Sequence, residues 1–363
     1  MSAYFNFTKR KSLSFPNSFN SYLPMVMFYP NKEGFREPSH ICAQLKQSLF
    51  ETLTICYPVS GRREDHTFIT CNDEGALYLE AKVNLNLIEF LTPPKLEFLN
   101  KLFPCEPNKM HSHRETLPQV LVQVNIFNCG GIAIGTCNLH TLLDAIFRGS
   151  REEVAFPDLS SASSFFPPLN HLSLHDHVDQ NNEDSSAQKM CTTRRYEALA
   201  AFIWKHMTLA CKMESDSTRP AVAIHIVDMR KRIGEPFSRY TIGNILWPMM
   251  VFCEKVNADT SVRYLVSIAR EKFGKLSREL FLIVKSDPNI LGSTQCMDLP
   301  QGIETRSPIP MTSWCGLNFS GLDFGFGKPL WVGVRGGDQE TLPNVAVIME
   351  TDEGMEAWLT MEM

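Results

Sequence analysis

The sequence has no long apolar run and no paired cysteines. No stretch of its 363 residues approaches the ~18 consecutive apolar residues of a membrane-spanning helix. The opening residues, MSAYFNFTKRKSLSF, lack the apolar core of a secretory signal. The 11 cysteines are odd in number and include no C-x-x-C pair, so free thiols in a reducing compartment are expected. These absences predict a cytoplasmic protein.

The motifs of several common ligand-binding and hydrolytic proteins are also missing. No G-x-G-x-x-G or Walker-type loop follows an expected strand, and no G-x-S-x-G elbow surrounds the serines at 160–164. Basic residues cluster only at 9–11 and 230–232, and the net charge is −5, so nucleic acid is not a predicted partner. The histidines at 111–113 and 171–177 lie in polar, proline-flanked stretches, and no metal site is predicted there.

The composition is that of a globular protein, with 44% hydrophobic and 21% charged residues. Its length predicts two domains. A stretch rich in proline, serine and acidic residues, 157–191, is typical of a linker. We therefore expect an N-terminal domain over 1–156 and a C-terminal domain over 192–363.

The hydrophobic pattern predicts α/β structure in both halves. Apolar residues at helical spacing predict a helix over 38–56. Two β-hairpins are expected, one joining 66–71 to 76–83 and one joining 119–127 to 132–139. In the second half the predicted helices are 196–211 and 262–282, and the predicted strands are 222–229, 330–334 and 344–349.

His140 follows the last residue of the second predicted hairpin. Strand ends and the loops after them often carry reactive groups in α/β proteins. Imidazole accepts a proton near neutral pH, which makes His140 a candidate general base, with Asp144 four residues later as a possible buttress. The spacing alone equally fits a histidine bonded to a backbone carbonyl, so other residues must decide.

Those other residues lie far away in the sequence. With His140-x-x-x-Asp144 and the late Asp323-Phe-Gly-Phe-Gly327, the chain resembles the plant BAHD acyltransferases, in which D-F-G-W-G is usual. Further agreement follows in order along the chain: Tyr57-Pro-Val-Ser-Gly-Arg62, Asn72-Asp-Glu-Gly75, Ala200-Ala-Phe-Ile-Trp204, Ile242-Gly-Asn244 and Thr312-Ser-Trp314. The resemblance covers almost the whole sequence.

The resemblance implies a fold of two α/β domains with mixed sheets and an interdomain channel. It implies transfer of an acyl group, acetyl or another short acyl, from acyl-CoA to a hydroxyl of a specialised metabolite. Acyl-CoA is then a co-substrate and no bound cofactor is expected. The quoted motifs look most like those of members that acetylate alkaloid alcohols or acylate sugars. A monomer without membrane or nucleic-acid partners is the expected state.

By the same resemblance, His140 takes the proton of the acceptor hydroxyl. Donors aimed at the oxyanion of an acyl-transfer intermediate stabilise it strongly. Thr312 and Trp314 are the candidates, and a core role for the Trp314 ring is the competing interpretation. Asn244 is placed near the channel wall by the match of its glycine-asparagine pair.

Four further positions are implied to be structural, together with a partner arginine. Asp144 is implied to point away from the substrate, and Asp323 to pair with an arginine, for which Arg230 is the best match. Gly325 and Gly327 suit a turn that side chains disfavour.

The sequence departs from the family at several places. The helix expected after His140 loses its pattern after Phe147, a second segment is short near Thr193, and both ends are short. Two explanations for these four short segments stay open. One is an incomplete gene product, which the number of losses favours, and the other is a family member that has repacked around the gaps. A catalytically inactive relative that binds without turnover is therefore the alternative function. A hydrolase that passes the acyl group to water is a third.

Overall fold

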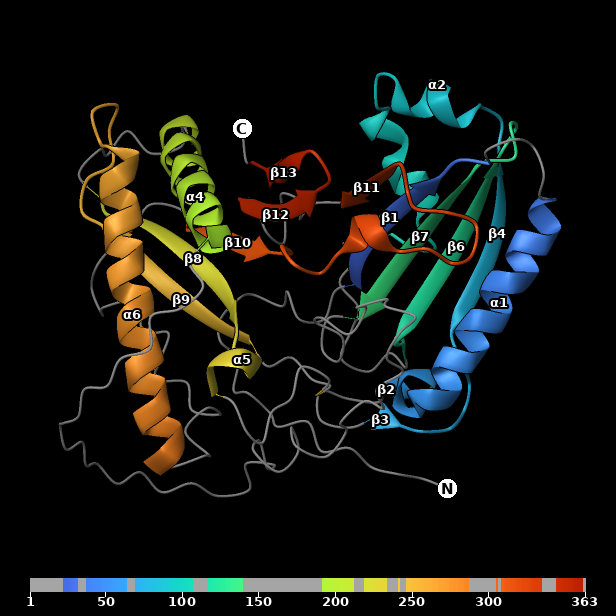
Figure 1. Ribbon diagram of the computed structural model, residues 1–363, viewed down its shortest axis with the longest axis horizontal. Helices are drawn as coiled ribbons and strands as arrows, with labels where there is room; N and C mark the ends of the chain where they lie inside the picture. Colours follow the sequence, from blue (N-terminus) through green and yellow to red (C-terminus); the bar gives the residue numbers. More distant parts are fainter. Residues whose placement is uncertain are drawn as a thin grey trace.

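Two five-stranded sheets, one in each half of the molecule, organise the fold (Figure 1). The computed structural model describes residues 22–31, 37–63, 69–106, 117–139, 191–211, 219–233, 241, 246–286, 305, 308–334 and 344–361. Both sheets contain parallel and antiparallel neighbours, as the resemblance implies.

The first sheet has the order β11-β1-β7-β6-β4. Its strands are β1 (Tyr22–Tyr29), β4 (Leu77–Val83), β6 (Val120–Phe127), β7 (Ile132–Leu139) and β11 (Trp331–Val334). β6 and β7 form the predicted antiparallel hairpin, and Gly130 in its turn has a φ of 75°. β1, which the sequence pattern did not reveal, lies along β7 and pairs Tyr22 with Leu139. β7 is therefore the central strand of this sheet.

The other predicted hairpin is wrong. β3 (Ile69–Thr70) pairs with β2 (Arg62–Arg63), which also pairs with β5 (Leu117–Pro118), in a small third sheet. β4 instead runs parallel to β6 in the first sheet. The intervening residues include Asp73 and Gly75, both with positive φ, and they direct the chain to a different sheet rather than back along the same one.

The second sheet has the order β13-β12-β10-β8-β9. Its strands are β8 (Ala221–Asp228), β9 (Leu246–Cys253), β10 (Ile309–Ser313), β12 (Val345–Thr351) and β13 (Gly354–Thr360). β8, β10 and β12 run parallel, and both edge strands are antiparallel to their neighbours. The predicted strands at 222–229 and 344–349 are confirmed.

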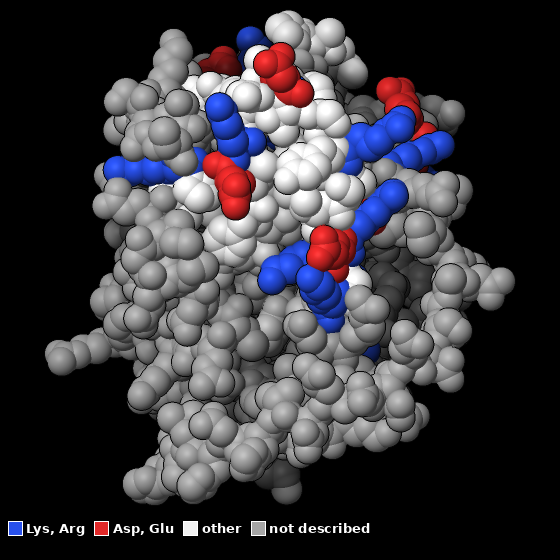
Figure 2. All heavy atoms as spheres, turned by 90° about the vertical axis from the view of Figure 1, so that its left-hand side faces the viewer, with Lys and Arg blue, Asp and Glu red and all other residues white. Residues whose placement is uncertain are grey.

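Two long helices pack against the second sheet. α4 (Cys191–Ala210) and α6 (Val262–Ser286) bury Trp204 and Leu265 in a core with residues of β8, β9, β10 and β12. Arg270 Nε lies 2.7 Å from Glu197 Oε2 and joins the helices at the surface. Figure 2 shows this side of the molecule, where the described acidic and basic side chains lie next to each other rather than in separate patches.

A third long helix, α1 (Pro38–Ile55), covers the first sheet, in agreement with the predicted helix over 38–56. Ile41, Cys42 and Leu45 are its buried side chains. The shorter helices are η3 (Tyr57–Ser60), α2 (Leu87–Leu91), η4 (Leu96–Leu102), α5 (Arg230–Ile233) and η7 (Phe319–Gly321). In the described part of the chain, no helix combines the length and apolar character needed to cross a bilayer.

The two halves share one apolar core, which we call the bridging cluster. Its members come from the first sheet, α1 and the C-terminal half, and include Met25, Ile41, Val120, Ile134, Trp314, Val332 and Val347. In addition, β11 from the C-terminal half pairs with β1. The predicted linker lies outside the described residues up to 190, so the domain limits at 156 and 191 stay predictions.

Candidate active site

The residue before His140 is held rigidly. Leu139 ends β7, is 0% exposed, and donates its N–H to Gln119 O at 2.8 Å. On the neighbouring strand β1, Leu139 pairs with Tyr22. His140, Asp144 and Asn244 themselves lie outside the described residues. The structure therefore fixes the point at which the chain enters the histidine motif, from the centre of a sheet.

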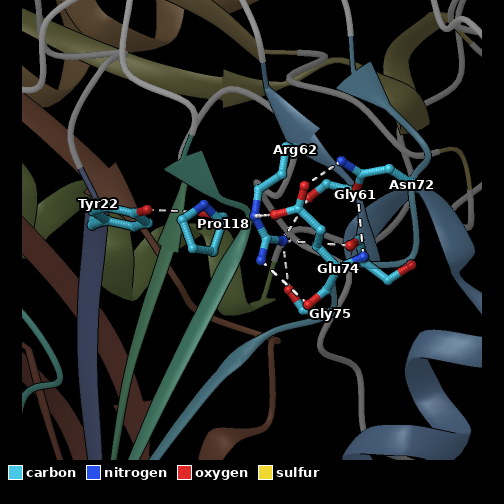
Figure 3. A network of polar contacts seen from close by, with 8 residues as sticks. Tyr22, Gly61, Arg62, Asn72, Glu74, Gly75 and Pro118 are labelled. Carbon is cyan, nitrogen blue, oxygen red and sulfur yellow. Dashed lines mark hydrogen bonds and ion pairs between the residues drawn. The ribbon is translucent and has the colours of Figure 1, made fainter.

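Tyr22 is itself held by a side-chain hydrogen bond. Its hydroxyl donates to Pro118 O at 2.8 Å (Figure 3). Pro118 pairs with Arg62, the last residue of the Tyr57-Pro-Val-Ser-Gly-Arg62 motif. A continuous set of contacts thus joins this motif to the end of β7.

Arg62 organises the turn that follows β3 (Figure 3). Its Nε lies 2.9 Å from Glu74 Oε2, and its Nη1 donates to Gly75 O at 2.6 Å. Asn72 Nδ2 donates to Glu74 Oε1 at 2.6 Å. The Tyr57–Arg62 and Asn72–Gly75 motifs, which are separate in the sequence, therefore form one structural unit. Nothing in their spacing indicated this contact.

Thr312 and Trp314 lie at the end of β10. Thr312 is half-buried and pairs with Ile226 of β8 and Val347 of β12. The Trp314 backbone N–H donates to Ile348 O at 2.8 Å. Trp314 is 8% exposed and belongs to the bridging cluster, with Phe319 5.5 Å from it between ring centroids. The ring is thus a core residue at the junction of the halves, and an oxyanion role stays a prediction.

The Asp323-Phe-Gly-Phe-Gly327 segment is a turn closed by its own aspartate. Asp323 Oδ1 accepts hydrogen bonds from the N–H groups of Gly325 at 2.7 Å and Gly327 at 2.9 Å. Both glycines have φ near 100°, 96° and 102°, where side chains are disfavoured. The expected glycine turn is therefore present.

This turn docks on the first half of the chain. Tyr29 of β1 meets Phe326 edge-on at 5.1 Å between centroids and donates its hydroxyl to Leu322 O at 3.2 Å. Gln44 of α1 donates to Phe324 O. Burial, helped by the negative charge of Asp323, raises the pKa of Tyr29 far above its ordinary value, so this hydroxyl stays protonated as a donor. Tyr29 and Gln44 were not among the predicted residues.

Arg230 is buried just after β8. Its Nε donates to Thr241 O at 2.9 Å, and its Nη1 lies 3.1 Å from Asp228 Oδ1. Asp228, two positions earlier, is thus an ion-pair partner of Arg230, and the pairing of Arg230 with Asp323 stays a prediction. The aspartate of Val227-Asp-Met-Arg230 is a local partner that the family match had not suggested.

Comparisons with known proteins were made against this structural background. The model of the Transferase family matches residues 17–147 and 163–362. Akuammiline synthase 2 from Alstonia scholaris is 32% identical over 390 residues, covering 94% of this chain and 86% of the relative. Stemmadenine O-acetyltransferase from Catharanthus roseus is 27% identical over 378 residues with the same coverage. The chain is a plant BAHD acyltransferase.

The fold agrees with that assignment. A crystal structure of vinorine synthase superposes with a TM-score of 0.72 and 23% identity, covering 99% of this chain and 94% of that one. The predicted α/β class with two mixed sheets is confirmed. As in other BAHD acyltransferases, an acyl-CoA thioester is the co-substrate.

The family match has one interruption. Residues 148–162 fall between its two segments. This gap begins directly after Phe147, where the sequence pattern of the expected helix ends. The BAHD relatives are nevertheless matched over most of their length, 86% for the two named above.

Proposed function

We propose that this protein transfers an acetyl or other short acyl group from acyl-CoA to a hydroxyl of a plant specialised metabolite. His140 acts as the general base and removes the hydroxyl proton while the oxygen attacks the thioester carbonyl. The tetrahedral intermediate then breaks its C–S bond, and the imidazolium returns the proton to the departing CoA thiolate. The products are the ester and free CoA.

Thr312 and Trp314 are the proposed oxyanion donors. A donor aimed at the developing negative charge typically contributes about 3–4 kcal/mol to transition-state stabilisation. The single observation that supports the proposal is the bridging cluster, because it packs Trp314 against the sheet whose central strand leads into His140. β7 and β8 also run from opposite sides toward the middle of the molecule (Figure 1).

The acceptor class follows the relatives. Stemmadenine is an acceptor named for one of them, and we propose an alkaloid alcohol as the acceptor here, with a sugar hydroxyl as the second choice. We further propose that the protein acts as a monomer in the cytoplasm. Alkaloid alcohols are the first acceptors to test because akuammiline synthase 2, which is 32% identical to this chain, and stemmadenine O-acetyltransferase are both among its relatives.

The test is thiol release from acetyl-CoA with stemmadenine, other alkaloid alcohols and partly acylated sugars offered as acceptors. Wild type is compared with His140→Ala and with His40→Ala, which removes an exposed histidine of α1. Loss of the general base lowers kcat by about 10²- to 10⁴-fold, whereas His40→Ala keeps the wild-type rate. Equal rates in all three proteins would rule out His140 as the base.

The interruption of the family match at 148–162 favours one alternative, a relative that binds acyl-CoA without turnover. Chromatography of the products separates the cases. Acylated alcohol supports the transferase, free acid alone indicates a hydrolase, and CoA binding without either product supports the inactive relative.

A further inference from the structure

Asn138 is a buried amide near the carboxyl end of β7. The residue is 7% exposed, and its Oδ1 atom is fully buried without a hydrogen-bond partner. An unpartnered buried polar atom destabilises the folded state because it has lost its hydrogen bonds to water. Such a group in a native protein calls for an explanation, and functional roles are among those known.

The position of Asn138 in the sheet supports a binding role. Its cross-strand neighbours are Val120 on β6 and Leu23 on β1. Val120 belongs to the bridging cluster, Leu23 packs against it, and Trp314 is a member. Because side chains opposite one another in a sheet share a face, Asn138 lies on the face that receives Trp314. It also lies two residues before the histidine motif.

Gln119 is the instructive contrast. Its Nε2 and Oε1 atoms are also buried and unpartnered, and the residue is 0% exposed. It stands opposite Leu139, one position along the ladder, so strand alternation places it on the other face of the sheet, where Leu139 packs. Gln119 has no exposed surface, whereas Asn138 is 7% exposed and lies on the face that carries Trp314. Because the Oδ1 atom of Asn138 is itself buried, a substrate bonds it only when the Asn138 side chain turns toward that substrate.

We propose that Asn138 is a substrate-binding residue of this acyltransferase, and that its amide oxygen accepts a hydrogen bond from a donor group of a bound substrate. The inference rests on the proposed function. Two substrate groups have the required chemistry, a hydroxyl of the alcohol acceptor other than the one that reacts, and the amide N–H groups of the pantetheine arm of acyl-CoA. Both are neutral donors, and kinetics can distinguish them.

The experiment compares Asn138→Leu, Asn138→Asp and Gln119→Met with wild type. Leucine keeps the approximate volume and removes the acceptor atom, so it raises one KM about 5- to 10-fold while kcat stays within about twofold. A raised KM for the alcohol assigns the bond to the acceptor, and a raised KM for acetyl-CoA assigns it to the donor. Aspartate, which keeps an acceptor oxygen at the same position, restores part of the loss.

Thermal unfolding and CoA titration complete the design. Both Asn138→Leu and Gln119→Met remove an unpartnered buried polar group, so neither lowers the unfolding midpoint, and only the first changes a KM. Unchanged KM values in a folded Asn138→Leu protein would overturn the proposal. If wild type releases no thiol with any acceptor, the proposed function fails by itself. Calorimetric titration with free CoA then tests Asn138 separately, and equal affinities for wild type and Asn138→Leu would overturn the remaining assignment to the donor.

Discussion

His225 provides a measurable pH dependence of stability. It lies on β8, is 4% exposed, and its Nδ1 lies 3.2 Å from the Tyr196 hydroxyl. Phe273 of α6 packs against the ring at 5.4 Å between centroids. Burial lowers the pKa of His225 from its ordinary value of 6.5 to about 4, because the protonated ring would be a charge in an apolar core.

The sign of the effect follows from the proton balance. Between about pH 6.5 and pH 4 the unfolded chain binds a proton at His225 and the folded chain does not, so stability falls as the pH is lowered. The shift corresponds to about 3 kcal/mol over the whole window, with a slope approaching 1.4 kcal/mol per pH unit. Above about pH 7 and below about pH 4 the contribution of His225 no longer changes with pH.

The perturbation is His225→Gln, which retains a hydrogen-bonding group for Tyr196 and does not titrate. Urea unfolding followed by tryptophan fluorescence at about pH 7, 6, 5 and 4.5 gives the free energy of unfolding of each protein. From about pH 7 to about pH 4.5, the free energy of unfolding of wild type is expected to fall by about 2.5 kcal/mol more than that of His225→Gln. His206→Gln, which replaces an exposed histidine of α4, is the matched control. Parallel pH profiles for wild type and His225→Gln would refute the reasoning.

Two predictions concern the frame of the first sheet. A Cβ at Gly135 on β7 would lie 2.0 Å from Leu102 O, so Gly135→Ala forces η4 off the sheet and lowers the free energy of unfolding by about 1–3 kcal/mol in urea titrations. An unchanged midpoint would contradict the close approach. Arg62→Lys keeps the charge but loses the guanidinium group that bonds both Glu74 and Gly75. We expect the free energy of unfolding to fall by about 1–2 kcal/mol in the same assay. A variant as stable as wild type would show that these contacts of Arg62 do not stabilise the fold.

The sequence predicted the elements that local patterns define. α1, α6 and the β6–β7 hairpin follow from helical spacing or from strand alternation around a glycine turn. β9 escaped prediction because Pro248 lies within it. Proline is tolerated there because β9 is an edge strand, and strand order is a property of the tertiary fold. The strand over 76–83 was predicted correctly as β4, but its pairing with 66–71 was wrong for a related reason, since its partner β6 lies some forty residues away.

Residues of the candidate site were predictable only where they belong to a motif of the family. Family resemblance supplied Thr312, Trp314 and Asp323, but it did not reveal that Tyr29 and Gln44 receive the Asp323 turn. The resemblance also did not indicate that Asp228, two residues before Arg230, is an ion-pair partner of that arginine. The unpartnered oxygen of Asn138 is a property of its surroundings, and no residue pattern encodes it.

The pairing of β11 with β1 has a consequence for the synthesis of the chain. β1 emerges from the ribosome early, whereas its neighbour β11 begins at Trp331, more than three hundred residues later. Until then, the β1 edge facing β11 has exposed N–H and C=O groups, which can pair with any passing strand. The N-terminal half therefore carries an unpaired sheet edge until β11 has been synthesised, and a premature stop before residue 331 releases a chain in which that edge stays open.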